Sequence, residues 1–293
     1  MRFILTGDGI TAFWQAGLAR GEASLCGHEP SGEIRWSKPI MDRFVDLIPF
    51  ATGDFCAVVY RLATRAMRFS WYTPTGHLRA ETEIEFTGAL LGTAANDDLV
   101  SVIGSDSTFF QRRWGGGQQK AVMGSGPLDA PKVGGSQARF AKLLAFSYGA
   151  GWILLDQIRG QYSELNSNLA ESRSGVLKHP LIQKSVSQQD SAVESRSDEL
   201  ARLGRSGSVS MPLSIFAAAL DFVGGLWVVP SPLNPSNISV FRVELNRLEA
   251  GETRRIPLPA KQVVGNLPPL LFSSFKTTCA FAYRTGFAVQ FDT

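Results

Sequence analysis

Histidine, serine and carboxylate side chains are the usual components of acid–base and nucleophilic catalysis, and this chain is poor in histidine. Its three histidines are His28, His77 and His179. A Ser-His-Asp arrangement needs a histidine held between a nucleophile and a carboxylate. His28 and His77 lie in turn-like contexts, and His179 precedes a proline. The sequence therefore predicts surface or helix-capping roles for these histidines rather than a catalytic triad.

One pair of residues does have a spacing that suggests chemistry. The segment Arg173–His179 (RSGVLKH) places an arginine and a histidine on either side of a short spacer. This pattern resembles the R-x₄₋₆-H motif of HEPN-type ribonucleases, in which paired helical protomers cut RNA by acid–base chemistry. The resemblance implies that Arg173 and His179 form an acid–base pair on helical structure and act on RNA.

A second candidate site combines positive charge with an aromatic ring. Arg112, Arg113 and Trp114 precede three consecutive glycines, and Lys120 follows them. Arginine can clamp phosphates with two hydrogen bonds, and aromatic rings stack on bases. The four residues are therefore candidates for binding single-stranded nucleic acid. The alternative is a surface loop with scattered positive charge.

Metal and thiol chemistry have little material in this chain. Cys26, Cys56 and Cys279 are far apart in sequence, so no C-x-x-C pair exists to support a zinc or redox site. Three glutamates alternate with other residues at positions 81, 83 and 85, and a solvated strand face accounts for this spacing. The sequence predicts no metal site and no cofactor.

Composition sets the broad class. The chain has 293 residues, of which 44% are hydrophobic and 19% charged, and its formal net charge is +3. Disordered chains are poorer in aromatic residues and richer in charge, so a folded globular protein is expected. The small net charge does not predict a dedicated binder of polyanions or membranes. The amino terminus lacks the continuous apolar segment of a secretory signal, so synthesis in the cytoplasm is expected.

Local patterns divide the chain into three regions. Residues 1–135 read as a β-rich region, in which the alternating runs 67–72 and 78–86 around a Thr-Pro-Thr-Gly turn predict a hairpin. Residues 136–205 read as a helical arm, and residues 206–293 as a second β-rich region that packs with the first. The predicted fold class is α+β: a β-rich body of antiparallel sheets from the N- and C-terminal regions, with a central helical insertion or arm.

The helical arm rests on apolar spacing. Apolar residues recur every three or four positions from Phe140 to Leu169, which predicts a helix. Its stretch Leu143–Leu155 is too short to span a membrane, so a buried core helix is expected, with reversible membrane insertion as a weaker alternative. Pro180 ends this helix, and a second, polar helix follows and runs to Leu203. Six residues on the two helices are candidates for oligomer contacts: Tyr162, Leu165, Leu169, Val186, Val193 and Leu200.

Three further expectations follow from local patterns. Short helices are expected at residues 12–20, after a glycine turn, and at residues 213–222. No sequence repeat of 20–50 residues is visible, and this counts against solenoids and β-propellers.

No coherent catalytic set emerges, so the main hypothesis is a non-catalytic structural or assembly subunit of a large complex. A virus or phage particle, with a coat or capsid protein, is the foremost example of such an assembly. The expected partners are further copies of the chain or other protein subunits, nucleic acid is a secondary candidate, and a membrane is not expected. The alternative is an RNA-binding or HEPN-like ribonuclease effector that uses Arg173 and His179.

Overall fold

A computed structural model describes the chain in segments. The described residues are 2–5, 11–16, 23–29, 31, 33–88, 90–104, 108–122, 132–133, 136–137, 143–148, 151–166, 170–195, 213–221, 224–231, 237–247, 249–251, 253–257, 271–275, 278–282 and 288–292. They divide into two compact units, and each unit is described by itself. Unit 1 comprises Met1–Val122, Ala219–Val223 and Asn266–Thr293, and unit 2 comprises Met123–Ala218 and Gly224–Gly265.

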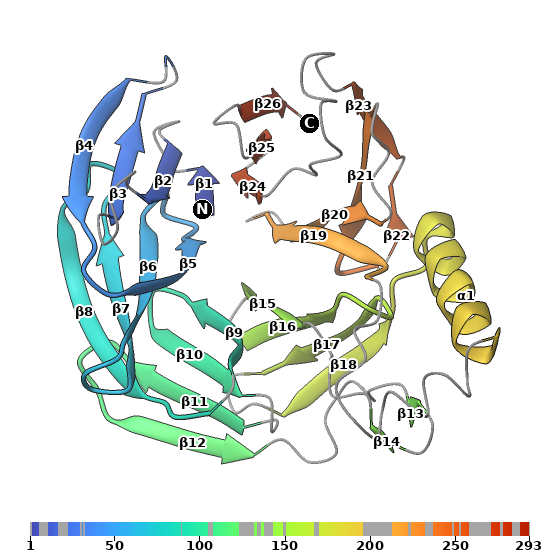
Figure 1. The fold of residues 1–293 in the computed structure, drawn as a ribbon, viewed down its shortest axis with the longest axis horizontal. Coiled ribbons are helices and arrows are strands. Elements are labelled where there is room, and N and C mark those ends of the chain that lie inside the picture. The colour runs from blue at the N-terminus through green and yellow to red at the C-terminus, as the bar shows by residue number, and fades with distance from the viewer. Residues whose placement is uncertain are drawn as a thin grey trace. The chain divides into compact units, whose positions relative to one another are not determined.

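The described residues are nearly all β-sheet, arranged as consecutive antiparallel sheets in which each strand pairs with the next, except that β23 pairs with β21 (Figure 1). This up-and-down order is typical of the blades of β-propellers. Four of the described sheets have four strands each. The α+β prediction is therefore wrong, and so is the argument against a propeller. The structural repeat is present, whereas the sequence repeat that usually reveals it is not.

Unit 1 contains three four-stranded sheets and one three-stranded sheet. The strands of the first sheet are β1 (Arg2–Leu5), β2 (Thr11–Ala16), β3 (Ala23–His28) and β4 (Ile34–Pro39). Those of the second are β5 (Arg43–Pro49), β6 (Phe55–Arg61), β7 (Ala66–Tyr72) and β8 (Leu78–Glu85). Those of the third are β9 (Leu90–Ala95), β10 (Leu99–Gly104), β11 (Thr108–Arg113) and β12 (Gln118–Val122). The three-stranded sheet contains β24 (Leu271–Phe275), β25 (Thr278–Ala282) and β26 (Ala288–Asp292), and β24 lies beside β1.

Unit 2 contains the other sheets and the helix. A two-stranded pair consists of β13 (Lys132–Val133) and β14 (Ser136–Gln137). A four-stranded sheet follows, with β15 (Leu143–Tyr148), β16 (Gly151–Asp156), β17 (Gln161–Leu165) and β18 (Glu171–Val176). The helix α1 covers Pro180–Ser195. The last sheet contains β19 (Ile215–Leu220), β20 (Gly225–Pro230), β21 (Asn237–Glu244), β22 (Glu249–Ala250) and β23 (Arg254–Pro257).

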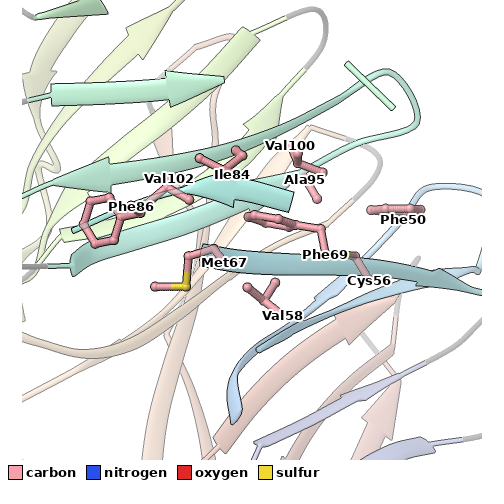
Figure 2. Close-up of a cluster of buried hydrophobic side chains, with 10 residues drawn as sticks. All are labelled: Phe50, Cys56, Val58, Met67, Phe69, Ile84, Phe86, Ala95, Val100 and Val102. Carbon is pink, nitrogen blue, oxygen red and sulfur yellow. The ribbon is translucent and has the colours of Figure 1, made fainter. Parts of the chain in front are cut away.

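In the second sheet of unit 1, strand β6 is buried on both faces over residues 55–59, which explains its apolar sequence. One face contributes Phe69, Ile84 and Val58 to a cluster that includes Val100 and Val102 of β10 (Figure 2). The other face contributes residues of β5 and β6 to a cluster with Ile4 and Leu25 of the first sheet. Strands enclosed on both sides are expected to be apolar throughout rather than alternating.

A tryptophan fastens the first sheet of unit 1 to the second. Trp36 of β4 donates from Nε1 to the Pro74 carbonyl over 3.0 Å and stacks on Phe55 with ring centroids 6.0 Å apart. The indole fits because two neighbours lack side chains: a Cβ on Gly27 would lie 2.2 Å from Trp36 Nε1, and one on Gly76 would lie 2.7 Å from Trp36 Cδ2. Gly76 also has φ +80°, which disfavours other residues.

The predicted first helix of the arm is a set of strands. β15 and β16 pair antiparallel, with Tyr148 opposite Gly151, and β17 continues the sheet. β16 is buried along its whole length. An apolar run without alternation suits a doubly buried strand as well as a buried helix, and the helical spacing was therefore misleading. The 136–205 region is thus not a helical arm.

Other local predictions have mixed outcomes. The hairpin predicted from residues 67–86 is present as β7 and β8. A helix does begin at Pro180, the position where proline fits best because its missing N–H costs nothing there. The short helices predicted at 12–20 and 213–222 are wrong, because β2 and β19 occupy the described parts of these segments.

In the described part of the chain, no helix is both long and apolar enough to cross a membrane.

Candidate functional site

A buried carboxylate organises one end of the second and third sheets of unit 1. Asp54 follows the turn between β5 and β6, where the amide of Phe50 donates to the Asp54 carbonyl over 2.9 Å. The Asp54 side chain is only 4% exposed. Its Oδ2 accepts a hydrogen bond from Trp71 Nε1 at 2.9 Å and forms an ion pair with Arg79, whose Nε lies 3.1 Å away. Two donors, one of them charged, thus compensate the burial of this carboxylate.

The same contacts hold two tryptophans next to each other. The Arg79 guanidinium lies over the Trp71 ring, 5.8 Å from its centroid. The ring of Phe50 meets the Trp71 ring edge-to-face, with centroids 5.2 Å apart. Trp114, from the turn between β11 and β12, contacts Trp71 with centroids 5.6 Å apart. Both indoles are half-buried. A rigid aromatic pair with an exposed edge is therefore presented by two sheets.

The turn between β9 and β10 fixes Trp114 from a third direction. Asn96 Oδ1 accepts from the amides of Asp98 and Leu99 at 2.9 and 2.7 Å, which closes the turn. The Asn96 carbonyl accepts from Trp114 Nε1 at 2.9 Å, and the Trp114 amide donates to the Asp98 carbonyl over 3.2 Å. Asp97 lies between these residues and is exposed.

The electrostatics of this turn are negative. Partial burial, together with the charges of Asp54 and Asp98, raises the pKa of Asp97 above its ordinary value, and Arg79 opposes the shift. One guanidinium therefore lies among three carboxylates. We call Phe50, Asp54, Trp71, Arg79, Asp97 and Trp114 the tryptophan cluster. These groups are suited to binding rather than catalysis. They comprise aromatic rings, a cation stacked on one of them, and more carboxylates than cations.

The predicted nucleic-acid residues are placed near this cluster, but two of them have structural partners. Arg112 donates from Nε to the Gly116 carbonyl at 2.6 Å and from Nη1 to the Glu83 carbonyl at 2.7 Å, so it ties the β11–β12 turn to β8. Trp114 belongs to the tryptophan cluster. Arg113 is exposed, and the exposed Lys120 lies 5.5 Å from the centroid of the Phe110 ring. Of the two arginines, the guanidinium of Arg112 is therefore occupied by carbonyl groups of its own fold.

The predicted acid–base pair is not in a helical setting. Arg173 lies on strand β18, where its Nη2 binds Glu164 Oε2 at 2.8 Å and the Leu245 carbonyl at 2.6 Å. His179 is buried immediately before α1 and stacks on Phe241 with centroids 3.6 Å apart. Both side chains are engaged with their own partners in the fold. The helical context that the ribonuclease resemblance implies is absent at Arg173.

His179 instead caps the helix, as the sequence suggested. Its Nδ1 accepts from the Leu181 amide at 3.3 Å, and its Nε2 lies 3.0 Å from Thr253 Oγ1. Because Nδ1 accepts, the neutral ring carries its proton on Nε2 and donates to Thr253. Burial lowers the pKa of His179, which favours this neutral form.

The predicted oligomer-contact residues are mostly not on the surface. Tyr162 and Leu165 lie on β17 and are buried, and Val186 of α1 is half-buried. Val193 belongs to α1, and Leu169 and Leu200 lie outside the described residues. Because Tyr162 and Leu165 lie on a buried strand, these two residues do not belong to a helical contact face.

The glutamates of β8 have basic partners within their own sheet. Glu83 Oε1 lies 2.6 Å from Arg61 Nη1, and Glu81 Oε2 lies 3.8 Å from Arg68 Nε. Asp42 contacts both arginines, at 3.7 and 3.1 Å. This network explains the acidic face without a metal. Among the described residues, no group of three His, Cys, Asp or Glu is placed to hold a metal ion.

The sequence interpretation did not find Asp54, Trp71, Arg79 or Asp97 as one site. Trp71 and Arg79 were assigned only to the predicted hairpin, and neither Asp54 nor Asp97 was singled out. One signal was available: Arg79 is a cation at the start of a strand whose next outward-facing residues are acidic. The residues meet only because separate turns of two neighbouring sheets lie at the same end.

Comparisons with known proteins support the fold alone. No family model and no curated protein matches the chain. Among solved structures, the nidogen/laminin complex matches with a TM-score of 0.50 at 11% identity, covering 96% of this chain and 88% of that one. A streptogramin B lyase matches with a TM-score of 0.49 at 10% identity, covering 99% and 82%. BBS1N in complex with ARL6DN matches with a TM-score of 0.44 at 12% identity, covering 96% and 74%. The nidogen/laminin match is to a β-propeller protein, in agreement with the sheet order described above.

Proposed function

We propose that the chain is a non-catalytic protein-binding subunit of a larger assembly, and that the tryptophan cluster is its contact surface. The observation that carries the proposal is the half-buried pair Trp71 and Trp114, held by Asp54 and the Asn96 carbonyl. Tryptophan and arginine are the residues most enriched at energetic hot spots of protein interfaces. The cluster combines both types at the exposed end of two sheets.

The cluster is also rigid before any partner binds. Each indole nitrogen has a hydrogen-bond acceptor, and Arg79 is fixed by both a carboxylate and a ring. Ordering a side chain at an interface costs about 0.5–1.5 kcal/mol, and a preorganised side chain avoids this cost. The arrangement therefore favours binding at low entropic cost. The nidogen/laminin complex is an example of a protein partner for a chain of similar fold.

The finer parts of the sequence hypothesis differ in their support. Membership of a virus or phage particle stays a prediction, and neither the fold nor the comparisons favour a capsid. RNA binding is not favoured, since Arg112 has carbonyl partners and Trp114 is half-buried against Trp71. Partners that are protein subunits, including further copies of the chain, are what the cluster best supports.

The test uses the full chain and two variants of the cluster, Trp114→Ala and Arg79→Ala. Leu62→Ala is the matched control, because Leu62 is exposed in the turn after β6, whereas Asp54 precedes the same strand. Light scattering coupled to size-exclusion chromatography measures self-association. Affinity purification with quantitative mass spectrometry then identifies other partners, and calorimetry with the purified partner gives Kd.

The expected result is a complex that the control retains and that both cluster variants weaken by about tenfold or more, as for interface hot spots. Unfolding curves of the purified variants establish that they remain folded. A complex that forms equally with all four proteins, or a chain that stays monomeric and captures no partner, would overturn the proposal.

A further inference from the structure

The tryptophan cluster already contains one complete guanidinium site, occupied by the chain's own Arg79. The guanidinium lies over an aromatic face, 5.8 Å from the Trp71 centroid, and its Nε is 3.1 Å from Asp54 Oδ2. Stacking on tryptophan and pairing with a carboxylate are the two interactions by which arginine is most strongly recognised. At 54% exposed, the Arg79 side chain is reachable from solvent.

Trp114 and Asp97 lie on two turns that are hydrogen-bonded to each other. Trp114 contacts Trp71, and the β9–β10 turn that carries Asp97 is hydrogen-bonded to both the backbone and the indole of Trp114. Among the described residues, the recorded cation–ring contacts are made by Lys38, Arg79 and Lys120, and none of these lies over Trp114.

The charge balance of the cluster is not neutral. Asp54 and Asp97 contribute two carboxylates and Arg79 contributes one guanidinium, and the neighbouring Asp98 adds a third carboxylate that acts on Asp97. The raised pKa of Asp97 has this like-charge repulsion as one of its causes, after partial burial. A cation placed beside Asp97 would relieve the repulsion, whereas an anion would increase it.

We infer that the tryptophan cluster recognises an arginine or lysine side chain of a basic protein segment, which stacks on Trp114 and pairs with Asp97. This inference rests on the proposed function and names the chemistry of the partner. The partner's basic side chain would contact Trp114 and Asp97 in the same way that Arg79 contacts Trp71 and Asp54 within this chain. A partner that is acidic, such as a nucleic acid, does not fit this surface.

The test measures binding of a hexa-arginine peptide to the full chain by calorimetry at two salt concentrations. Hexa-glutamate and a single-stranded RNA hexamer serve as ligand controls. The variants are Asp97→Asn and Trp114→Ala. Glu85→Gln is the matched control, because Glu85 is an exposed carboxylate at the far end of β8 from Arg79.

The expected result is saturable binding of hexa-arginine that weakens in higher salt. Asp97→Asn should weaken it about tenfold, the range expected when a charged hydrogen bond is lost. Glu85→Gln should leave Kd within about twofold, because surface charges away from the contact contribute little. No saturable binding, equal losses in Asp97→Asn and Glu85→Gln, or tighter binding of either acidic ligand would overturn the inference.

A further variant distinguishes a built guanidinium site from a general negative surface. Arg79→Met removes the internal guanidinium and leaves Trp71 and Asp54 able to receive one from the peptide. Hexa-arginine should therefore raise the Tm of Arg79→Met by more than it raises the Tm of the wild type. An equal or smaller rise would contradict the stacked geometry.

The two proposals can fail separately. If Trp114→Ala abolishes capture of the natural partner and hexa-arginine does not bind, the surface binds protein but not through a basic side chain. If capture is insensitive to both cluster variants, the proposed function itself is wrong.

Discussion

The sheet β5–β8 of unit 1 and the sheet β15–β18 of unit 2 share one topology and use their buried polar groups differently. In β5–β8, the buried Asp54 binds side chains that reach the surface, Trp71 and Arg79. In β15–β18, the buried Asp156 accepts the backbone amide of Ile158 at 2.8 Å and remains inside. Burial raises the pKa of Asp156. The first arrangement displays side chains to solvent, and the second closes a turn.

The polar residues of α1 in unit 2 are also used for buried contacts. Gln189 of α1 donates from Nε2 to Ser214 Oγ at 2.8 Å and to the Ile158 carbonyl at 3.3 Å. Gln157 donates to the carbonyls of Ile215 and Phe216 at 3.2 and 3.1 Å. These buried contacts hold α1 and β19 against the turn after β16. The polar residue Gln189 of α1, which belonged to the predicted projecting arm, therefore holds the helix against its own sheet.

The largest expected effect tests the double burial of β5–β8. Phe69 is fully buried among the side chains drawn in Figure 2. Phe69→Ala should lower the free energy of unfolding by about 3–5 kcal/mol, through lost transfer energy and a cavity. Denaturant unfolding followed by circular dichroism measures the change. A loss below about 1 kcal/mol would mean that the two sheets do not pack closely around this ring.

An intermediate effect tests Asp54, the buried carboxylate whose partners reach the surface. Asp54→Ala removes the acceptor of Trp71 Nε1 and of Arg79 Nε. Leaving a buried donor unsatisfied costs about 1–3 kcal/mol, so the unfolding free energy should fall by that amount. Asp42→Ala is the control, because Asp42 also pairs with arginines but is more exposed, and its loss should cost about 0–1 kcal/mol. Equal losses would argue against Asp54 as the organising group.

A smaller effect tests, through pH, the buried histidine that caps α1 in unit 2. Burial lowers the folded-state pKa of His179 below the unfolded value of about 6.5. Between these two values the unfolded state binds more protons, so stability is full above about pH 6.5 and falls as the pH decreases through that window. Protonation at Nδ1 also removes the acceptor of the Leu181 amide and places positive charge at a helix N-terminus.

Hydrogen exchange of the α1 amides at a series of pH values measures this effect, after correction for the intrinsic pH dependence of exchange. The protection of α1 should decrease as the pH falls from about 7 to 5, and His179→Gln should remove that dependence. Protection that stays constant in the wild type, or a pH dependence that His179→Gln retains, would contradict a capping role for the neutral ring.

The smallest effect concerns the hydroxyl of Tyr162. It is buried without a hydrogen-bond partner, and a Cβ on Gly175 would lie 2.9 Å from it. Tyr162→Phe removes an unsatisfied polar group and keeps the ring, so the free energy of unfolding should stay within about 0.5 kcal/mol or rise. A loss above about 1 kcal/mol in chemical unfolding would show that the hydroxyl has a partner.

Several elements of the fold could be predicted from the sequence because they depend on local pattern. The alternation in residues 67–86 is matched by the hairpin of β7 and β8, and Pro180 marks the start of α1. The capping role of His179 also follows from its position before the proline. Each of these depends on neighbours within a few residues.

Only the tertiary structure decided whether the apolar run around Leu143–Leu155 is a helix or two strands. A continuous apolar run is compatible with a buried helix and with a strand that is buried on both faces. The pairing of β15 with β16 shows that this run forms strands. The same is true of the tryptophan cluster. Asp54, Trp71, Arg79, Asp97 and Trp114 come from separate turns and strands, and sheet packing brings them together. The sequence by itself determined local features such as the hairpin of β7 and β8. The packing of the sheets decided which side chains meet, because that depends on contacts between residues far apart in the chain.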